Sequence, residues 1–128
     1  MKLYYLAFSA RGLALAQKLA ASLGGEAARC GGPVTLQGWT EAHFETGAGL
    51  VYIGACGIAV RAAAPFLKSK ETDPAVVAVD EQGRYAVPLL SGHLGGANAL
   101  ARAIGRACGA QPVLTAATDA GGLFPVDD

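Results

Sequence analysis

Cysteine is scarce in this 128-residue sequence, and neither sign of charge is in excess. The three cysteines, Cys30, Cys56 and Cys108, are odd in number, far apart and without a CxxC pair. That pattern argues against a disulfide scaffold or a zinc site and fits a reducing cytosol. Ten Lys plus Arg balance ten Asp plus Glu, so the field of the whole molecule gives no support to a nucleic-acid partner or an acidic membrane surface.

Long apolar runs are also missing. No stretch approaches the roughly 20 apolar residues that a membrane span requires, and the short apolar start of the chain soon meets Arg11. The sequence therefore predicts a soluble, cytoplasmic protein without a membrane partner. Because 52% of the residues are hydrophobic, residues 1–128 are expected to form a single domain with a core of its own.

Short apolar runs alternate with helical patterns along the chain. Apolar runs without strict alternation are typical of strands buried on both faces of a parallel sheet, and a short loop around Gly83 indicates a hairpin. The pattern predicts a three-layer α/β/α domain with a mostly parallel, mixed sheet that includes this one hairpin. Strands are expected at residues 3–8, 34–36, 50–53, 75–79, 85–90 and 112–119, and helices at 10–23, 41–45, 58–66 and 95–108.

Four loops follow the carboxyl ends of predicted strands, where ligands lie in sheets of this kind. They are residues 9–11, 54–57, 91–96 and 115–119. Whether all four lie at one edge of the sheet depends on the direction of the hairpin strands, which this interpretation leaves open.

The segment GACGIAVR, residues 54–61, leads from a strand into a helix. Gly54 and Gly57 at such a turn let the first free amides of the helix face a phosphate or a carboxylate, and Arg61 would reach back to the same anion. In a second interpretation the glycines only allow close packing of helix on sheet, and Arg61 extends into solvent. The spacings GxGxxG and GxxxxGK are both absent, so a dinucleotide or nucleoside triphosphate has little support.

The segment SGHLGGAN, residues 91–98, concentrates more chemistry. His93 exchanges protons near neutral pH, and it stands among glycines that expose backbone amides at a helix start; a structural role is the alternative. His43, in a polar helix, is interpreted as solvated or structural. No Ser/His/Asp pattern or second nearby histidine supports a triad or a metal site. The candidate binding residues around His93 are Ser91, Gly92, Gly95, Gly96 and Asn98.

The segment TAATD, residues 115–119, ends the last predicted strand with two hydroxyls and a carboxylate. Thr118 is a candidate for substrate binding. Asp119 is a candidate general base or an orienting partner for His93, and the alternative is a simple cap of the following turn.

Taken together, three segments closely resemble the N-terminal domain of the cobalamin biosynthesis CbiG family, the cobalt-precorrin-5A hydrolases. They are GACGIAVR, LKSKETDPAVVAVDEQGRYAVPLLSGHLGGANALA and TAATD, and the resemblance is dense from about residue 51 to residue 127. It implies hydrolytic opening of the ring A δ-lactone of cobalt-precorrin-5A and release of acetaldehyde, giving cobalt-precorrin-5B. The cobalt arrives inside the substrate, so no separate cofactor or catalytic metal is implied. The family's C-terminal domain is expected to be absent here and to act as a partner, together with other enzymes of the cobalamin pathway.

The resemblance also gives the candidate residues a task. A tetrapyrrole fringed with acetates and propionates would be held by amides at Gly95 and Gly96 and by cations such as Arg61, Lys68 and Lys70. His93 would then be the general base. Cys56 stands where the family's pattern has a threonine, so no hydroxyl role is transferred to it. Two alternatives remain open: a non-catalytic module that binds the precorrin for a second domain, and a small nucleotide- or phosphate-binding α/β protein.

Overall fold

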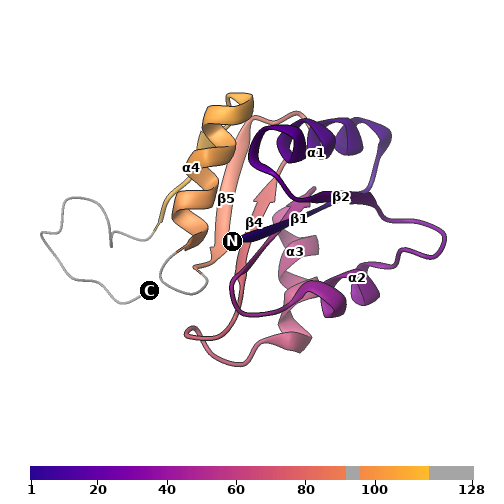
Figure 1. The fold of residues 1–128 in the computed structure, drawn as a ribbon, viewed down its shortest axis with the longest axis vertical. Helices are drawn as coiled ribbons and strands as arrows, with labels where there is room; N and C mark the ends of the chain where they lie inside the picture. The colour runs from indigo at the N-terminus through magenta and orange to yellow at the C-terminus, as the bar shows by residue number, and fades with distance from the viewer. Residues whose placement is uncertain (92–95, 116–128) are drawn as a thin grey trace, which may run out of the picture.

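The structure is a computed structural model that describes residues 1–91 and 96–115. In this part of the chain six strands form one sheet in the order β2-β1-β3-β4-β5-β6 (Figure 1). Strands β1 to β4 are parallel, β5 runs antiparallel to β4, and β6 is parallel to β5. The predicted mixed, mostly parallel sheet is confirmed. The strands are β1 Lys2–Ala7, β2 Glu26–Arg29, β3 Ala48–Ile53, β4 Ala75–Val79, β5 Tyr85–Leu90 and β6 Gln111–Pro112.

Among the described residues, two helices lie on each face of the sheet, as the predicted three layers require. Helices α1, Ala10–Leu23, and α4, Gly96–Cys108, bury their apolar side chains against one face. Helices α2, Leu36–His43, and α3, Cys56–Ala63, cover the other face, and a 3-10 turn extends α3. Strands β3 and β4 lie at the centre and are buried throughout. Within the described ranges no helix is long and apolar enough to cross a membrane.

The region between α1 and β3 differs from the prediction. A strand was expected at residues 34–36, but Thr35 is the N-cap of α2, and its hydroxyl accepts a hydrogen bond of 3.0 Å from the amide of Gly38. The helix expected at residues 41–45 begins earlier, so that Thr40 is buried inside α2, where its hydroxyl lies 2.8 Å from that of Tyr52. Burial raises the pKa of Tyr52 to about 12, so this pair remains a neutral hydrogen bond at physiological pH.

The sheet edges also differ from the prediction. Strand β2, which the sequence analysis missed, is a half-exposed edge strand that pairs only with β1. At the other edge, a strand was expected over residues 112–119, yet β6 ends at Pro112. Residues 116–119 of that expected strand lie outside the described residues.

A pair of adjacent glycines between α1 and β2 allows a matched test of the fold. Both have positive φ, +86° at Gly24 and +106° at Gly25. A Cβ at Gly25 would stand 2.3 Å from the carbonyl oxygen of Leu3, whereas one at Gly24 would meet no atom within 4 Å. We expect Gly24→Ala to cost about 1–3 kcal/mol from its backbone alone, because a φ of +86° with a ψ of 170° is a conformation that essentially only glycine adopts. Gly25→Ala should cost more, because the close contact with Leu3 is added. Urea denaturation of both variants measures the difference; equal losses would contradict the close approach of Leu3.

Candidate functional site

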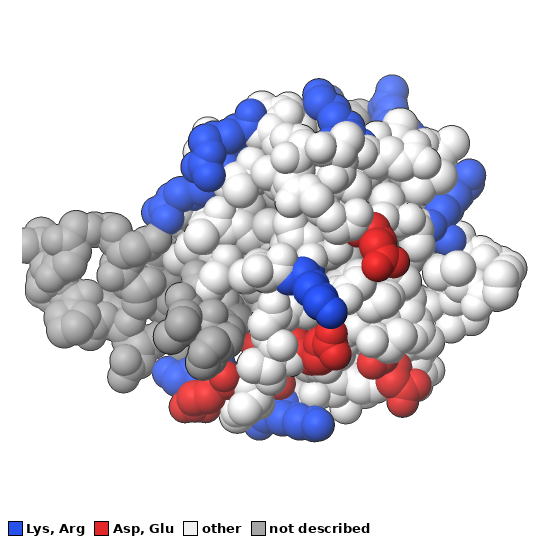
Figure 2. Space-filling view, in the orientation of Figure 1, with Lys and Arg blue, Asp and Glu red and all other residues white. Residues whose placement is uncertain are grey.

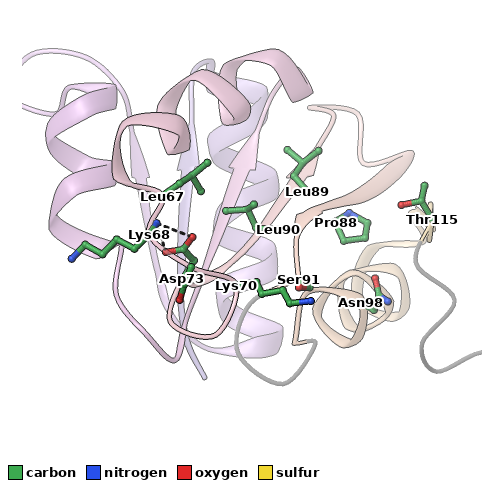
Figure 3. Close-up of a pocket in the computed structure, with 11 residues that line it drawn as sticks. Leu67, Lys68, Lys70, Asp73, Pro88, Leu89, Leu90, Ser91, Asn98 and Thr115 are labelled. Carbon is green, nitrogen blue, oxygen red and sulfur yellow. Dashed lines mark hydrogen bonds between the residues drawn. The ribbon is translucent and has the colours of Figure 1, made fainter. Parts of the chain in front are cut away.

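A cavity of about 520 Å³ opens at the edge of the sheet where strands β1, β3 and β4 begin (Figure 3). Because β5 runs in the opposite direction, its carboxyl end reaches this same edge. The loop of residues 67–73, between the 3-10 turn and β4, forms one wall. The other wall comes from the end of β5, from Asn98 on α4 and from Thr115 after β6. Segments far apart in sequence therefore meet around one opening.

The loop of residues 67–73 is held in shape by a buried carboxylate. Asp73 is 8% exposed, and its two carboxylate oxygens accept hydrogen bonds of 3.0 and 3.2 Å from the backbone amide of Lys68 (Figure 3). The amide of Asp73 donates in turn to the carbonyl of Ser69. Asp73 thus positions the backbone from which Lys68 and Lys70 extend.

Removal of this carboxylate should loosen the loop. We expect Asp73→Ala to lower the free energy of unfolding by about 1–3 kcal/mol, because it leaves a partly buried amide without its acceptor. Glu41→Ala removes an exposed carboxylate on α2 and should stay within about 0.5 kcal/mol. Chemical denaturation compares the two. A loss in Asp73→Ala no greater than in the control would show that the carboxylate does not hold the loop.

Two lysines from this loop bring positive charge to the cavity. Lys68 and Lys70 are both exposed and both line it. In Figure 3 the Lys70 side chain extends across the opening toward Ser91, whereas Lys68 points away from Ser91. Lys68 also lines a second cavity of about 260 Å³ beside Thr46 and Thr72. The two cavities share Asp73 and Lys68, and Glu45 also lines the second cavity, so the positive charge is concentrated at the loop of residues 67–73.

Ser91 and Asn98 form the polar part of the opposite wall. The carbonyl of Ser91 accepts a hydrogen bond of 2.8 Å from the amide of Ala97, which joins the end of β5 to the start of α4. Asn98 is only 5% exposed but lines the cavity. Its amide group can both donate and accept hydrogen bonds. Gly96 packs closely at this point, since a Cβ there would stand 2.4 Å from the Cε atom of Met1.

The predicted binding residues are divided between opposite edges of the sheet. Gly54 follows β3 at the carboxyl edge and Gly57 lies in the first turn of α3, while Ser91 and Asn98 line the cavity at the other edge. Arg61 is exposed on α3 and is not among the residues that line the cavity. At Gly54 a Cβ would approach the Phe8 ring to 3.2 Å, which fits the packing interpretation of that glycine. The cavity therefore does not bring Gly54, Gly57 and Arg61 together with Ser91 and Asn98.

Several candidates lie outside the described residues. These are Gly92, His93, Gly95, Thr118 and Asp119, so their roles stay predictions. Ser91 and Thr115, the described residues directly before the two segments that hold these candidates, both line the cavity. His43, interpreted as structural, stacks on Tyr4 with ring centroids 3.9 Å apart.

The apolar part of the cavity wall was not predicted from the sequence. Leu67 and the end of β5, Pro88 to Leu90, line it with hydrocarbon. Their signal in the sequence was the run PLL directly before SGH, which was interpreted only as strand. Within the described ranges, no three His, Cys, Asp or Glu side chains gather as metal ligands. On the face drawn in Figure 2, Lys and Arg lie mostly around the rim, whereas Asp and Glu lie mostly in the lower half of the face.

Fold and cavity together define the class of protein: an α/β domain with an open cleft suited to an anionic, partly apolar ligand. The family model described as "Cobalamin synthesis G N-terminal" matches residues 38–119. The chain belongs to this family.

Two curated proteins and one solved structure are similar to this chain. The cobalt-precorrin-5A hydrolase of Salmonella typhimurium is 51% identical over 84 residues, which are 66% of this chain and 24% of that protein. The cobalt-precorrin-5A hydrolase of Priestia megaterium is 49% identical over 84 residues, 66% of this chain and 22% of that protein. A crystal structure of a cobalamin biosynthesis protein G homolog from Sulfolobus solfataricus shares the fold, with a TM-score of 0.70 and 23% identity over 89% of this chain and 36% of its own. The chain thus spans about a quarter of the curated relatives it matches.

Proposed function

We propose that this chain takes part in cobalamin biosynthesis by binding cobalt-precorrin-5A for hydrolysis, in the reaction for which its curated relatives are named. The observation that carries the proposal is the cavity between the loop of residues 67–73 and the segment that leads to His93. Lys68 and Lys70 supply charge for the substrate's acetates and propionates, and the leucines of the wall supply apolar contact. The substrate brings the cobalt, and the reaction takes place in the cytoplasm.

The proposed chemistry needs proton transfer at two points. Water adds to the lactone carbonyl and the acyl C–O bond breaks, which leaves a carboxylate and a free hydroxyl. Loss of the hydroxyl proton then allows the adjacent C–C bond to break, acetaldehyde leaves, and the ring carbon takes up a proton. His93 is the proposed base, with Asp119 as its orienting partner. A positioned general base contributes about 10²- to 10⁴-fold in rate.

A non-catalytic binding module is the second candidate. One observation favours it: Asp73 is the single acid among the described residues that line the cavity, and its carboxylate is engaged by the Lys68 amide. The described walls thus offer binding groups but no free base. Under this alternative the chain holds the substrate while the rest of the hydrolase supplies the chemistry.

Anaerobic release of acetaldehyde from cobalt-precorrin-5A separates these functions. The chain is assayed alone and together with the remainder of the Salmonella typhimurium hydrolase, while the absorbance of the corrinoid reports binding. Release by the chain alone would mean a complete site, and release only with the added polypeptide would mean a composite site. Binding without release in both assays would favour the binding module. Neither binding nor release, or an equal response to nucleotides, would contradict the proposal.

A further inference from the structure

One end of the sheet presents an apolar surface that no helix of the described residues covers. Helices α2 and α3 pack over β3 and β4 on one face of the sheet, and α3 also contacts β5 near its carboxyl end, where Leu89 and Leu90 join the same cluster. Beyond them, at β5 and β6, the same face carries Tyr85, Val87 and Val113, which we call the open face. Tyr85 is 53% exposed and Val113 is 37% exposed.

The strand register places these three side chains together. Val87 pairs with Ala78, which belongs to the core beneath α3, and Tyr85 lies two residues earlier on the same strand. The amide of Val113 donates to the carbonyl of Ala86, which continues the β5–β6 pairing by one residue. Leu114 packs against the core on the α4 side, so Val113 faces the opposite way.

An uncovered face of this kind indicates a missing neighbour. Strand β5 runs antiparallel to β4 but forms a parallel pair with β6; parallel pairs in α/β proteins are normally covered on both faces, and each apolar Å² left in water forgoes roughly 25 cal/mol. Exposed apolar side chains that stand together mark contact sites more often than isolated ones do. Here they lie beside β6, the last strand of the described sheet.

The occupant follows from where the chain leaves the sheet. The matched region covers 24% and 22% of the two curated relatives, and the family model, described as N-terminal, ends at residue 119. In a relative with the same sheet order, the polypeptide that follows would leave the sheet beyond β6, because β6 is the last strand of the described residues. Thr115, the last described residue, lines the cavity, and β5 leads from the open face into the same wall.

We propose that the open face is the docking surface for the polypeptide that follows this domain in the cobalt-precorrin-5A hydrolases. Docked there, that polypeptide lies beside the cavity, where Leu67 is 49% exposed, and it completes the cavity wall. The docking of that polypeptide is inferred from the family and the fold, and only its part in the cavity wall rests on the proposed function. The docking and the proposed function are therefore tested by different experiments.

Hydrogen exchange by mass spectrometry tests the docking without any assay of catalysis. The whole chain is compared with a fusion in which it replaces the matched segment of the Salmonella typhimurium hydrolase. We expect amides of residues 85–90 and 111–115 to exchange at least tenfold more slowly in the fusion, and those of α2 to be unchanged. In the fusion the double variant Tyr85→Lys/Val113→Lys should lose that protection, whereas Val60→Lys, which changes an exposed valine on α3, should keep it.

A second measurement does not depend on the fusion folding. The chain and its double variant are each titrated with the separate remainder of the hydrolase, and we expect the variant to bind at least tenfold more weakly. Equal binding by both, or no added protection in a folded fusion, would overturn the proposal. Sedimentation of the chain alone supplies another outcome, since self-association abolished by the double substitution would identify a second copy as the occupant and also overturn it.

Discussion

Replacing His93 by Ala is expected to slow acetaldehyde release about 10²- to 10⁴-fold. Under the proposed function His93 accepts the proton of the attacking water or of the freed hydroxyl, and alanine offers no group that does so. Substrate affinity should change little, because the cations and apolar residues of the cavity remain. The measurement is the acetaldehyde rate under single-turnover conditions, with binding followed separately by corrinoid absorbance.

The other histidine of the chain, His43, supplies a matched control. His43 lies in an aromatic cluster with Tyr4 and Trp39, whose ring centroids are 3.9 and 5.2 Å away, and it does not line the cavity. We expect His43→Gln to affect stability and leave the rate per folded molecule unchanged. If His93→Ala lost binding and turnover equally, His93 would hold the substrate or the fold and would not be the base.

The core of the fold could be predicted because its strands have a strong local signal. The run AVVAV is β-branched and buried in β4, and Ser9 caps α1 as its position suggests, accepting a hydrogen bond from the amide of Gly12. Strand β2 has no such signal. Its residues, EAAR, are small or charged, and they form a strand only because they pair with β1. Pairing between distant segments is a tertiary effect that local patterns do not contain.

The placement of the predicted binding residues at opposite edges of the sheet could have been predicted from the sequence. Asp80 accepts hydrogen bonds from the amides of Arg84 and Tyr85, and Gly83 has a φ of +71°, so the turn between β4 and β5 is short. A hairpin forces β5 to run antiparallel, which carries Ser91 to the edge opposite Gly54. The sequence analysis identified the hairpin but left this consequence open. No local pattern in the sequence indicated that Asn98 and Lys70 line the same cavity, because their proximity depends on the packing of α4 beside β5.

Loss of both cavity lysines should produce the second large effect. We expect Lys68→Ala/Lys70→Ala to weaken binding of the corrinoid about 10- to 30-fold, which corresponds to about 1.4–2 kcal/mol, because an exposed ion pair contributes at most about 1 kcal/mol. Each ammonium group would pair with a carboxylate of the substrate. Both lysines are exposed, so salt should screen these pairs. Titrations of corrinoid absorbance at low and high ionic strength measure both the affinity and its dependence on salt.

The control must remove the same charge elsewhere. Lys18 on α1 and Arg29 on β2 are also exposed, and β2 is at the opposite end of the sheet from β5 and β6. Lys18→Ala/Arg29→Ala therefore changes the net charge equally without touching the cavity. Equal weakening in both double variants would mean that only the overall charge attracts the substrate. Loss confined to the Lys68/Lys70 variant, with a shallower dependence on salt, would mean that the carboxylates bind at the loop of residues 67–73. Turnover at saturating substrate should then remain near that of the unchanged chain, because these lysines bind the substrate and transfer no proton.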